Sequence, residues 1–291
     1  MPRSFTPVSL DGLDEYYRLW DLCPLHSLDY SPVNLWGWQE HYGLEWCFEG
    51  DLCWIRQTMP CDTVLWAPLG DWARADWKRL LEPGMEFIRV PDSLAALWQE
   101  QIGSRAAAEP DRDQWEYLYL ATELATLPGN RFHKKKNHVS AFVKAYGAPD
   151  YRPMDARMVE DCLGLQDEWC QWHDCEGSPS LAAENSAINQ VLAHCSAFRN
   201  LCGGSLYVDG GIAAFALGER LDRDSVGVHF EKGLASIRGI YQVINQTFVQ
   251  RECADVRWVN RAQDLGEEGL RRAKESYRPA GFLQKSRVAI A

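Results

Sequence analysis

The chain has 291 residues, a formal net charge of −11, an apolar fraction of 46% and thirteen tryptophans. This length favours two domains over one, and the apolar content supplies enough core material to exclude a disordered chain. The negative charge excludes a general nucleic-acid coat but leaves room for a local basic site, so we expect no DNA partner.

The sequence gives no sign of a membrane-spanning or secreted chain. No apolar run approaches the roughly 18 residues that are needed to cross a bilayer. Residues 1–17 lack the apolar core of a signal peptide. We therefore expect a cytoplasmic protein without a transmembrane segment, and a peripheral position at a membrane is left open.

Ten cysteines are spread along the chain without a Cys-x-x-Cys pair. In a cytoplasmic chain we expect them to be reduced and many of them buried, because a free cysteine behaves as a small apolar residue. One stretch, WCQWHDCE, brings Cys170, His173, Asp174 and Cys175 close together. Zinc usually takes four ligands in two spaced pairs, and no second pair is evident, so we predict no metal site.

The first half of the chain alternates strand-like with helix-like segments. The predicted strands are 46–55, with a hairpin turn at Glu-Gly-Asp, then 62–70, 85–90 and 115–121. The predicted helices are 76–84 and 92–102, each opened by an aspartate cap, and 132–146. The polar stretch 105–113 is predicted to be a loop. Two prolines and a glycine in 147–153 indicate a boundary, so we predict domains 1–147 and 148–291.

The second half has a clearer pattern. Its predicted helices are 154–173, 184–198, 237–253 and 267–277. Its predicted strands are 225–233, 256–260 and 282–290, preceded by a hairpin at 205–221 around Asp209, Gly210 and Gly211. One crossover helix between two strands is combined with antiparallel hairpins. The fold class is therefore α/β or α+β with a mixed sheet.

The stretch 259–282 surrounds one tyrosine with basic side chains. Asp264 with Glu267 three residues later predicts a capping box. Arg271, Lys274 and Arg278 form one basic stripe if the helix continues to Arg278. A solvated helix face and a phosphate contact both explain this stripe. The run RFHKKK at 131–136 is denser and would attract an anionic ligand despite the overall charge.

Several motifs resemble known acyltransferases. A strand, a helix opened near Arg-Gly, a strand and a helix ending in A-x-x-x-Y-x-x-x-G-F resemble the GNAT-type fold, and Ala273, Tyr277, Gly281 and Phe282 match that signature in register. More narrowly, the chain resembles a soluble family akin to the C-terminal domain of phosphatidylglycerol lysyltransferases. The segments that carry this resemblance are SPVNLWGW (31–38), LATLPGNRFHKKKNHVSAF (124–142), VHFEKG (228–233) and VNRAQDLGEEGLRRAKESYRP (259–279). It implies two tandem GNAT-like units, as in Fem-type aminoacyl-tRNA-dependent transferases.

The resemblance also implies an activity. We expect an acyltransferase that moves an aminoacyl group from aminoacyl-tRNA to a hydroxyl or amine acceptor, a lipid or a small molecule, without a required cofactor. The alternatives are an N-acyltransferase that uses acetyl-coenzyme A and a non-catalytic binding protein with the same fold. The lysyltransferases that give the family its name carry a membrane-spanning part, and none is expected in this chain, so a soluble acceptor is left open beside a phospholipid.

The segment SIRGIYQ distinguishes between the donors. GNAT-type enzymes hold the coenzyme A pyrophosphate at a helix N-terminus, where a Gly-x-Gly/Ala pattern keeps the turn free of side chains. Arg238 and Gly239 fit this pattern, whereas Tyr241 stands where the second small residue is expected. This departure favours a donor without a pyrophosphate. Tyr241 also lies on an apolar helical stripe, and aromatic residues on such a stripe more often serve as core packing.

Four residues are the catalytic candidates. Tyr277 matches the tyrosine that protonates the leaving group in many GNAT enzymes, which here is a ribose oxygen. His229 and Glu231 lie two apart on one strand and are predicted to share a face, where either is a candidate base; a core histidine and an ion-paired glutamate are the alternatives. Asn260, at a strand end, is expected to orient a carbonyl. The substrate-binding candidates are Arg131, Lys134, Lys135, Lys136, Asn137, Arg238, Gly239, Arg261, Arg271 and Lys274.

Overall fold

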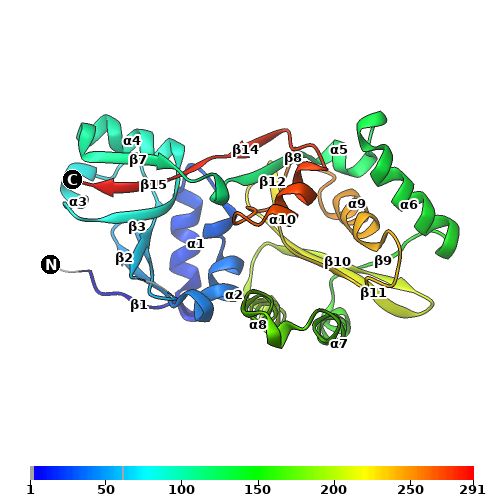
Figure 1. Ribbon diagram of the computed structural model, residues 1–291. Coiled ribbons are helices and arrows are strands. Elements are labelled where there is room, and N and C mark those ends of the chain that lie inside the picture. Colours follow the sequence, from blue (N-terminus) through cyan, green and yellow to red (C-terminus); the bar gives the residue numbers. More distant parts are fainter. Residues whose placement is uncertain (1–2, 61) are drawn as a thin grey trace. The chain divides into compact units, whose positions relative to one another are not determined.

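The computed structural model describes residues 3–60 and 62–291, and the chain divides into two compact units (Figure 1). Unit 1 contains the chain up to Glu116 together with Gln263–Glu268 and Phe282–Ala291. Unit 2 contains Tyr117–Ala262 and Gly269–Gly281. The chain thus passes from one unit to the other more than once.

In unit 1 the strands form one mixed sheet in the order β1-β2-β3-β4-β6-β15-β7, with β5 paired to β3. The strands are β1 (Thr6–Pro7), β2 (Leu44–Glu49), β3 (Leu52–Gln57), β4 (Val64–Trp66), β5 (Leu69–Gly70), β6 (Glu86–Pro91), β7 (Ala106–Pro110) and β15 (Lys285–Ile290). The helices are α1 (Leu13–Leu22), α2 (Pro32–Tyr42), α3 (Trp77–Leu80) and α4 (Asp92–Ile102). The parallel strands β4 and β6 are joined through α3.

The sequence predicted much of unit 1, but it missed β7. The hairpin of β2 and β3, strand β6 and helix α4 are confirmed. The predicted loop at 105–113 is wrong, because Ala106–Pro110 pairs with β15 from the far end of the chain. Of the two predicted aspartate caps, Asp76 does stand at the N-cap position of its helix. Asp76 makes no capping bond, and α4 begins at Asp92 itself.

The second sheet has the order β14-β8-β13-β12-β11-β10-β9 and contains one parallel pair, β12 with β13. Its strands are β8 (Glu116–Leu120), β9 (Asp150–Pro153), β10 (Leu201–Val208), β11 (Gly211–Arg220), β12 (Ser225–Gly233), β13 (Trp258–Asn260) and β14 (Gly281–Leu283). The helices of unit 2 are α5 (Ala121–Thr126), α6 (His133–Tyr146), α7 (Ala156–His173), α8 (Pro179–Ala193), α9 (Ile240–Glu252) and α10 (Glu268–Glu275), of which α10 begins in a residue of unit 1.

Helices cover both faces of the central strands of unit 2. Five consecutive residues of β11, from Ala213 to Leu217, are almost fully buried, which requires cover on both sides. Figure 1 shows α9 on one face of this sheet and α7 on the other. Helix α9 connects the parallel strands β12 and β13, as α3 connects β4 and β6 in unit 1. The expected fold class, α/β with mixed sheets, is confirmed, because each of the two sheets contains both parallel and antiparallel pairs.

The unit border differs from the predicted split at 147/148. Helices α5 and α6 precede that split, yet both pack on α9 in unit 2. The segment 147–153, which was predicted to mark the domain boundary, contains β9, and β9 pairs with β10. These contacts join residues far apart in the sequence, so local composition gives no sign of them.

Near the C-terminus the predicted helix is shorter than expected. Helix α10 ends at Glu275, and Arg278 has a left-handed backbone with φ of 57°. Arg278 therefore does not extend the basic stripe of the helix. Asp264 accepts the Gly266 N–H at 2.9 Å, so it stabilises the turn before α10. None of the helices in the described ranges is long and apolar enough to cross a membrane.

The expectation that all cysteines are reduced is wrong at one place. Helix α7 ends at His173, and the left-handed Asp174 turns the chain back, so that Cys170 and Cys175 form a disulfide with their Cα atoms 5.0 Å apart. The other cysteines of the described residues are free, and Cys23, Cys53, Cys162 and Cys253 are buried, as expected for small apolar side chains.

A buried group of charges lies inside unit 1. The Lys285 ammonium on β15 donates to Asp29 and, at 2.6 Å, to Glu116, and all three residues are almost fully buried. Arg89 on β6 also pairs with Asp29, and Ser27 donates to Glu116 at 2.6 Å. Burial alone would raise the pKa of Asp29, but Arg89 and Lys285 outweigh it and hold that pKa below its usual value. Lys285 on the C-terminal strand is therefore the cation that the two buried carboxylates share.

We expect Lys285→Met to destabilise unit 1 by at least about 3 kcal/mol, because it leaves two buried carboxylates without their shared cation. Arg287→Met on the same strand is the matched control, since the Arg287 side chain is 67% exposed and pairs with Asp111 at the surface. It should cost less than about 1 kcal/mol. Urea unfolding followed by tryptophan fluorescence measures both variants, and equal losses would contradict the assigned role of Lys285.

Candidate functional site

Tyr277 lies in the turn that follows α10 and is almost fully buried. Burial raises its pKa, and the nearby Glu231 carboxylate adds to this effect. The Arg261 guanidinium and a hydrogen bond from Gln242 oppose it, and the resulting pKa is about 12. The phenol is therefore protonated near neutral pH and is able to donate a proton.

Two cations contact the Tyr277 ring. The Lys135 ammonium from α6 lies 3.9 Å from the ring centroid, and the Arg261 guanidinium carbon, just after β13, lies 4.8 Å from it. Burial lowers the pKa of Lys135 to about 8, helped by repulsion from Arg261. Lys135 can therefore gain and lose a proton close to physiological pH, which an ordinary lysine cannot.

Glu231 holds Arg261 in place. One of its carboxylate oxygens accepts from Arg261, and the other accepts from the Asn245 amide on α9 at 2.8 Å. Because both oxygens are engaged, this geometry favours a positioning role for Glu231 over a role as base. Arg261 Nη1 and Asn245 Oδ1 are buried and have no hydrogen-bond partner among the described residues. Buried polar atoms of this kind are rare, and they leave a donor and an acceptor available to a ligand.

Hydrogen bonds to the backbone fix α10 beside this cluster. The Lys274 ammonium donates to the Arg261 carbonyl at 2.7 Å, and the Tyr119 hydroxyl donates to the Lys274 carbonyl at 2.7 Å. Lys274 therefore connects α10 to the end of β13, where Arg261 lies. This contact gives it a structural role besides the predicted phosphate contact.

The other catalytic candidates have partners of their own. His229 Nε2 lies 3.2 Å from Glu219 Oε2 on β11, and both side chains are buried. The register between β11 and β12 shifts beside His229. His229 contacts Glu219, whereas Glu231 contacts Arg261 and Asn245, so the two residues are not interchangeable as bases. Asn260 accepts the Ala262 N–H at 3.0 Å and so shapes the turn that presents Arg261.

The predicted substrate-binding residues do not form one cluster. Lys135 is the member of the run 131–136 that contacts Tyr277. Arg131 pairs with Glu123, and Asn137 bonds to His133 at 3.0 Å. Lys134 and Arg238 are exposed, whereas Lys136 and Arg271 are half-buried.

Gly239 has a packing explanation. Its φ is +85°, and a Cβ atom there would lie 2.4 Å from the His138 carbonyl oxygen of α6. The glycine is therefore required by the close approach of two backbones. Tyr241, two residues later, accepts a hydrogen bond from the Trp169 indole at 2.9 Å.

Sequence reasoning missed three members of the cluster, namely Gln242, Asn245 and Tyr119. Gln242 and Asn245 are three residues apart in α9, one directly before and one directly after the buried pair Val243 and Ile244. Two polar side chains about one helical turn apart, each next to a buried apolar residue, were the sequence signal that could have identified them. Tyr119 gave no signal, because it lies in a strand rich in aromatic residues.

Comparisons with known proteins agree with this fold. The family described as "Phosphatidylglycerol lysyltransferase, C-terminal" matches residues 21–289. A conserved protein of unknown function from Bacteroides thetaiotaomicron VPI-5482 is 29% identical, with a TM-score of 0.90 over 100% of both chains. The C-terminal domain (DUF2156) of an Agrobacterium fabrum protein named as a lysylphosphatidylglycerol synthetase is 13% identical, with a TM-score of 0.63 over 95% of this chain and 92% of that chain, and so shares the fold.

A curated relative extends the similarity to another bacterium. An uncharacterized protein of Mycoplasmoides gallisepticum is 25% identical over 201 residues. The matched region is 68% of this chain and 64% of that protein, so the match spans a little less than two thirds of the relative.

The geometry predicts how Lys135 titrates. Above a pH of about 8 its amine should be mostly neutral, and below that value mostly charged. Arg261→Gln removes a repelling cation and releases the Glu231 charge, so the pKa of Lys135 should rise. Carbon-13 NMR of reductively methylated lysines measures this pKa, with the signal assigned by Lys135→Arg. Lys144→Met, which changes an exposed position on the same helix, is the control and should leave the pKa of Lys135 unchanged. If the pKa of Lys135 were also unchanged in Arg261→Gln, the effect of Arg261 on Lys135 would be contradicted.

Proposed function

The chain belongs to the family of the phosphatidylglycerol lysyltransferase C-terminal domain, and on this premise we propose that unit 2 transfers an aminoacyl group from aminoacyl-tRNA to a hydroxyl or amine acceptor. Family and fold together point to an acyltransferase domain. The observation that carries the proposal is the buried Arg261 Nη1 donor, without a partner among the described residues, beside a protonated Tyr277 and a titratable Lys135.

Each of these three side chains takes one role in the transfer. The acceptor oxygen or nitrogen attacks the ester carbonyl carbon of the donor, and neutral Lys135 takes the proton that the acceptor loses. Arg261 Nη1 donates to the carbonyl oxygen as negative charge develops there. The bond between the acyl carbon and the ribose oxygen then breaks, and Tyr277 protonates that oxygen. The proton that Lys135 gains from the acceptor balances the one that Tyr277 gives to the ribose oxygen, and exchange with water restores both side chains after the transfer.

Exposed basic residues would contact the phosphates of the donor. Lys134 on α6 and Arg238 before α9 are exposed, and Lys136 is half-exposed. Such contacts supply binding that weakens as salt rises, because counterions are released from the nucleic acid. Their proposed role is to hold the donor, while the Tyr277 cluster carries out the chemistry.

Two observations favour this donor over coenzyme A. Gly239, which resembled part of a pyrophosphate loop, is accounted for by the close approach of the His138 carbonyl. The ring of Tyr241 is fixed at the start of α9 by its bond to Trp169. The proposed donor requires no cofactor, and acetyl-coenzyme A remains the alternative for the test. For the acceptor we propose a lipid head group or a small molecule that bears a hydroxyl or an amine.

The test is transfer of radiolabelled amino acids from pooled aminoacyl-tRNA to extracted lipids and to a panel of small amines and alcohols. The wild-type protein should transfer label at a rate that rises with pH and levels off above about 8, as Lys135 loses its proton. Tyr277→Phe should lower the rate about 10²- to 10⁴-fold and leave tRNA affinity unchanged. Lys144→Met on α6 is the matched control and should transfer at the wild-type rate.

Three outcomes would overturn parts of the proposal. Equal rates for Tyr277→Phe and wild type would remove Tyr277 as the general acid. Transfer from acetyl-coenzyme A without binding of tRNA would replace the donor. Binding of tRNA without transfer to any acceptor in the panel would favour a binding protein over an enzyme.

A further inference from the structure

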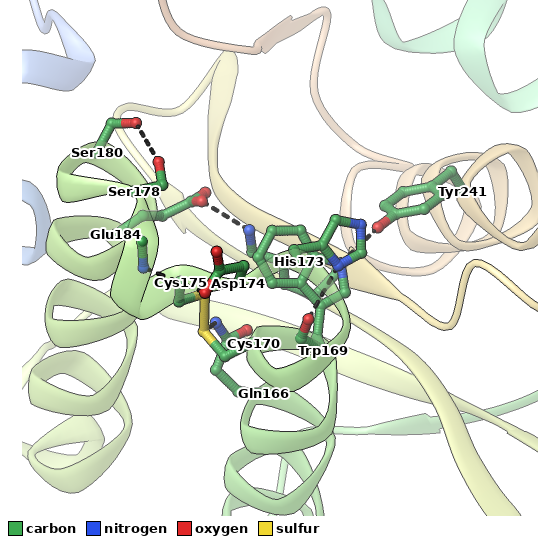
Figure 2. The surroundings of a disulfide bond; sticks show 12 residues. Gln166, Trp169, Cys170, His173, Asp174, Cys175, Ser178, Ser180, Glu184 and Tyr241 are labelled. Carbon is green, nitrogen blue, oxygen red and sulfur yellow. Dashed lines mark hydrogen bonds and ion pairs between the residues drawn. A yellow bond between two sulfur atoms is a disulfide. The ribbon is translucent and has the colours of Figure 1, made fainter.

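The disulfide joins the last turn of α7 to the segment that leads into α8. Figure 2 shows Cys170 on α7 bonded to Cys175, with Asp174 between the two elements. Asp174 has a left-handed φ of 50°, and its side chain accepts the Gly177 N–H at 3.3 Å. The bond therefore closes a short turn at the helix end and leaves the other cysteines of the described residues free.

The two sulfur atoms differ in access and share acidic surroundings. Cys170 is half-exposed, whereas Cys175 is buried. A reducing thiolate can therefore reach Cys170 more easily. The exposed carboxylates that flank the pair in the sequence are Asp167, Glu168, Asp174 and Glu176. Their negative charge disfavours the approach of small anionic thiols.

The interior already contains a partner for the reduced form. Gln166 is fully buried, and its amide nitrogen lies 3.6 Å from Cys170 Sγ. Its carbonyl oxygen has no hydrogen-bond partner among the described residues. A thiol at Cys170 would carry an S–H donor, which the disulfide lacks, and rotation of the Gln166 amide would present Oε1 to it as an acceptor.

The residue next to Cys170 links this turn to α9. The Trp169 indole donates to Tyr241 in the first turn of α9 and stacks on His173 at 3.9 Å (Figure 2). The Lys232 ammonium from β12 lies 3.7 Å from the Trp169 ring centroid and donates to Glu184 of α8 at 2.7 Å. Trp169 and His173 both belong to the last turns of α7, so the disulfide restrains the stack that holds Tyr241.

We propose that Cys170 and Cys175 form a reversible redox site, reduced by a protein dithiol of the thioredoxin class, and that its state controls the packing of Trp169 against the start of α9. This proposal stands independently of the proposed acyl transfer. It combines the only disulfide in the described residues with a buried acceptor and a direct contact to another helix.

The reduction proceeds by two exchanges. A thiolate of the reductant attacks Cys170 Sγ, the bond to Cys175 breaks, and Cys175 leaves as a thiolate that takes a proton. The second thiol of the reductant then attacks the mixed disulfide and releases Cys170 as a thiol. Two electrons and two protons pass to the protein, and the reductant becomes a disulfide.

The first measurement is made on the full chain by thiol alkylation and peptide mass spectrometry. Air-oxidised protein should contain a linked Cys170–Cys175 peptide, and thioredoxin with its reductase should expose two further alkylatable thiols. Glutathione at equal thiol concentration should act at least about tenfold more slowly, and added salt should narrow this gap by screening the carboxylates. The absence of the linked peptide, or equal rates at low salt, would overturn the proposed site or its reductant class.

The second measurement is amide hydrogen exchange before and after reduction. Exchange in peptides covering 165–178 and 238–245 should become at least about tenfold faster on reduction. The double variant Cys170→Ser with Cys175→Ser should exchange at the fast rate in both conditions. Cys195→Ser, which changes a half-exposed free cysteine of the same unit, should respond like the wild type.

The wild-type protein keeps this test decisive even if the double variant does not fold. If reduction made exchange faster at 165–178 but left it unchanged at 238–245, the proposed coupling between the disulfide and α9 would be wrong. Unchanged exchange in both segments of reduced wild-type protein would show that the disulfide restrains nothing, and would overturn the control of packing altogether.

Discussion

The buried Lys285 ammonium is the interaction on which unit 1 depends. It joins Asp29, from before α2, to Glu116, at the start of β8, and it is itself carried by the last strand of the chain. Buried charges stabilise a fold only when their partners are present, and losing one partner is costly. Unit 1 therefore completes its interior with the last residues of the chain. The place of β15 between β6 and the edge strand β7 has the same consequence.

In unit 2 an ion pair serves a different purpose. Glu231 and Asn245 fix the Arg261 side chain, and Arg261 in turn lies against Tyr277 and lowers the proton affinity of Lys135. Glu231 thus fixes the position of Arg261, and Arg261 in turn affects the protonation of Lys135. Arrangements that shift the pKa of a lysine and a tyrosine in one cluster are typical of functional sites, although ion pairs in a protein interior have the same effect.

Helix α9 connects the candidate site with the disulfide. Its first turn carries Tyr241, which is held by Trp169 of α7, and its next residue, Gln242, bonds to Tyr277. Asn245, one turn on, holds Glu231. A rigid helix transmits a displacement at one end to side chains within the next turn. These contacts connect the disulfide turn to α9 and α9 to the Tyr277 cluster. The hydrogen-exchange measurements test the first of these two connections.

The sequence by itself determined the elements with strong local patterns. The hairpins, the helix at 133–146, the crossover of β12, α9 and β13, and the motif around Tyr277 follow from periodicity, turn residues and a resemblance carried by short segments. Only the tertiary structure decided β7, the unit border and the end of α10, because these rest on contacts between distant segments. The same holds for the site. Folding brings α6, β12, the end of β13 and the turn after α10 together. Only these contacts select Lys135 from its basic run and pair Glu231 with Arg261.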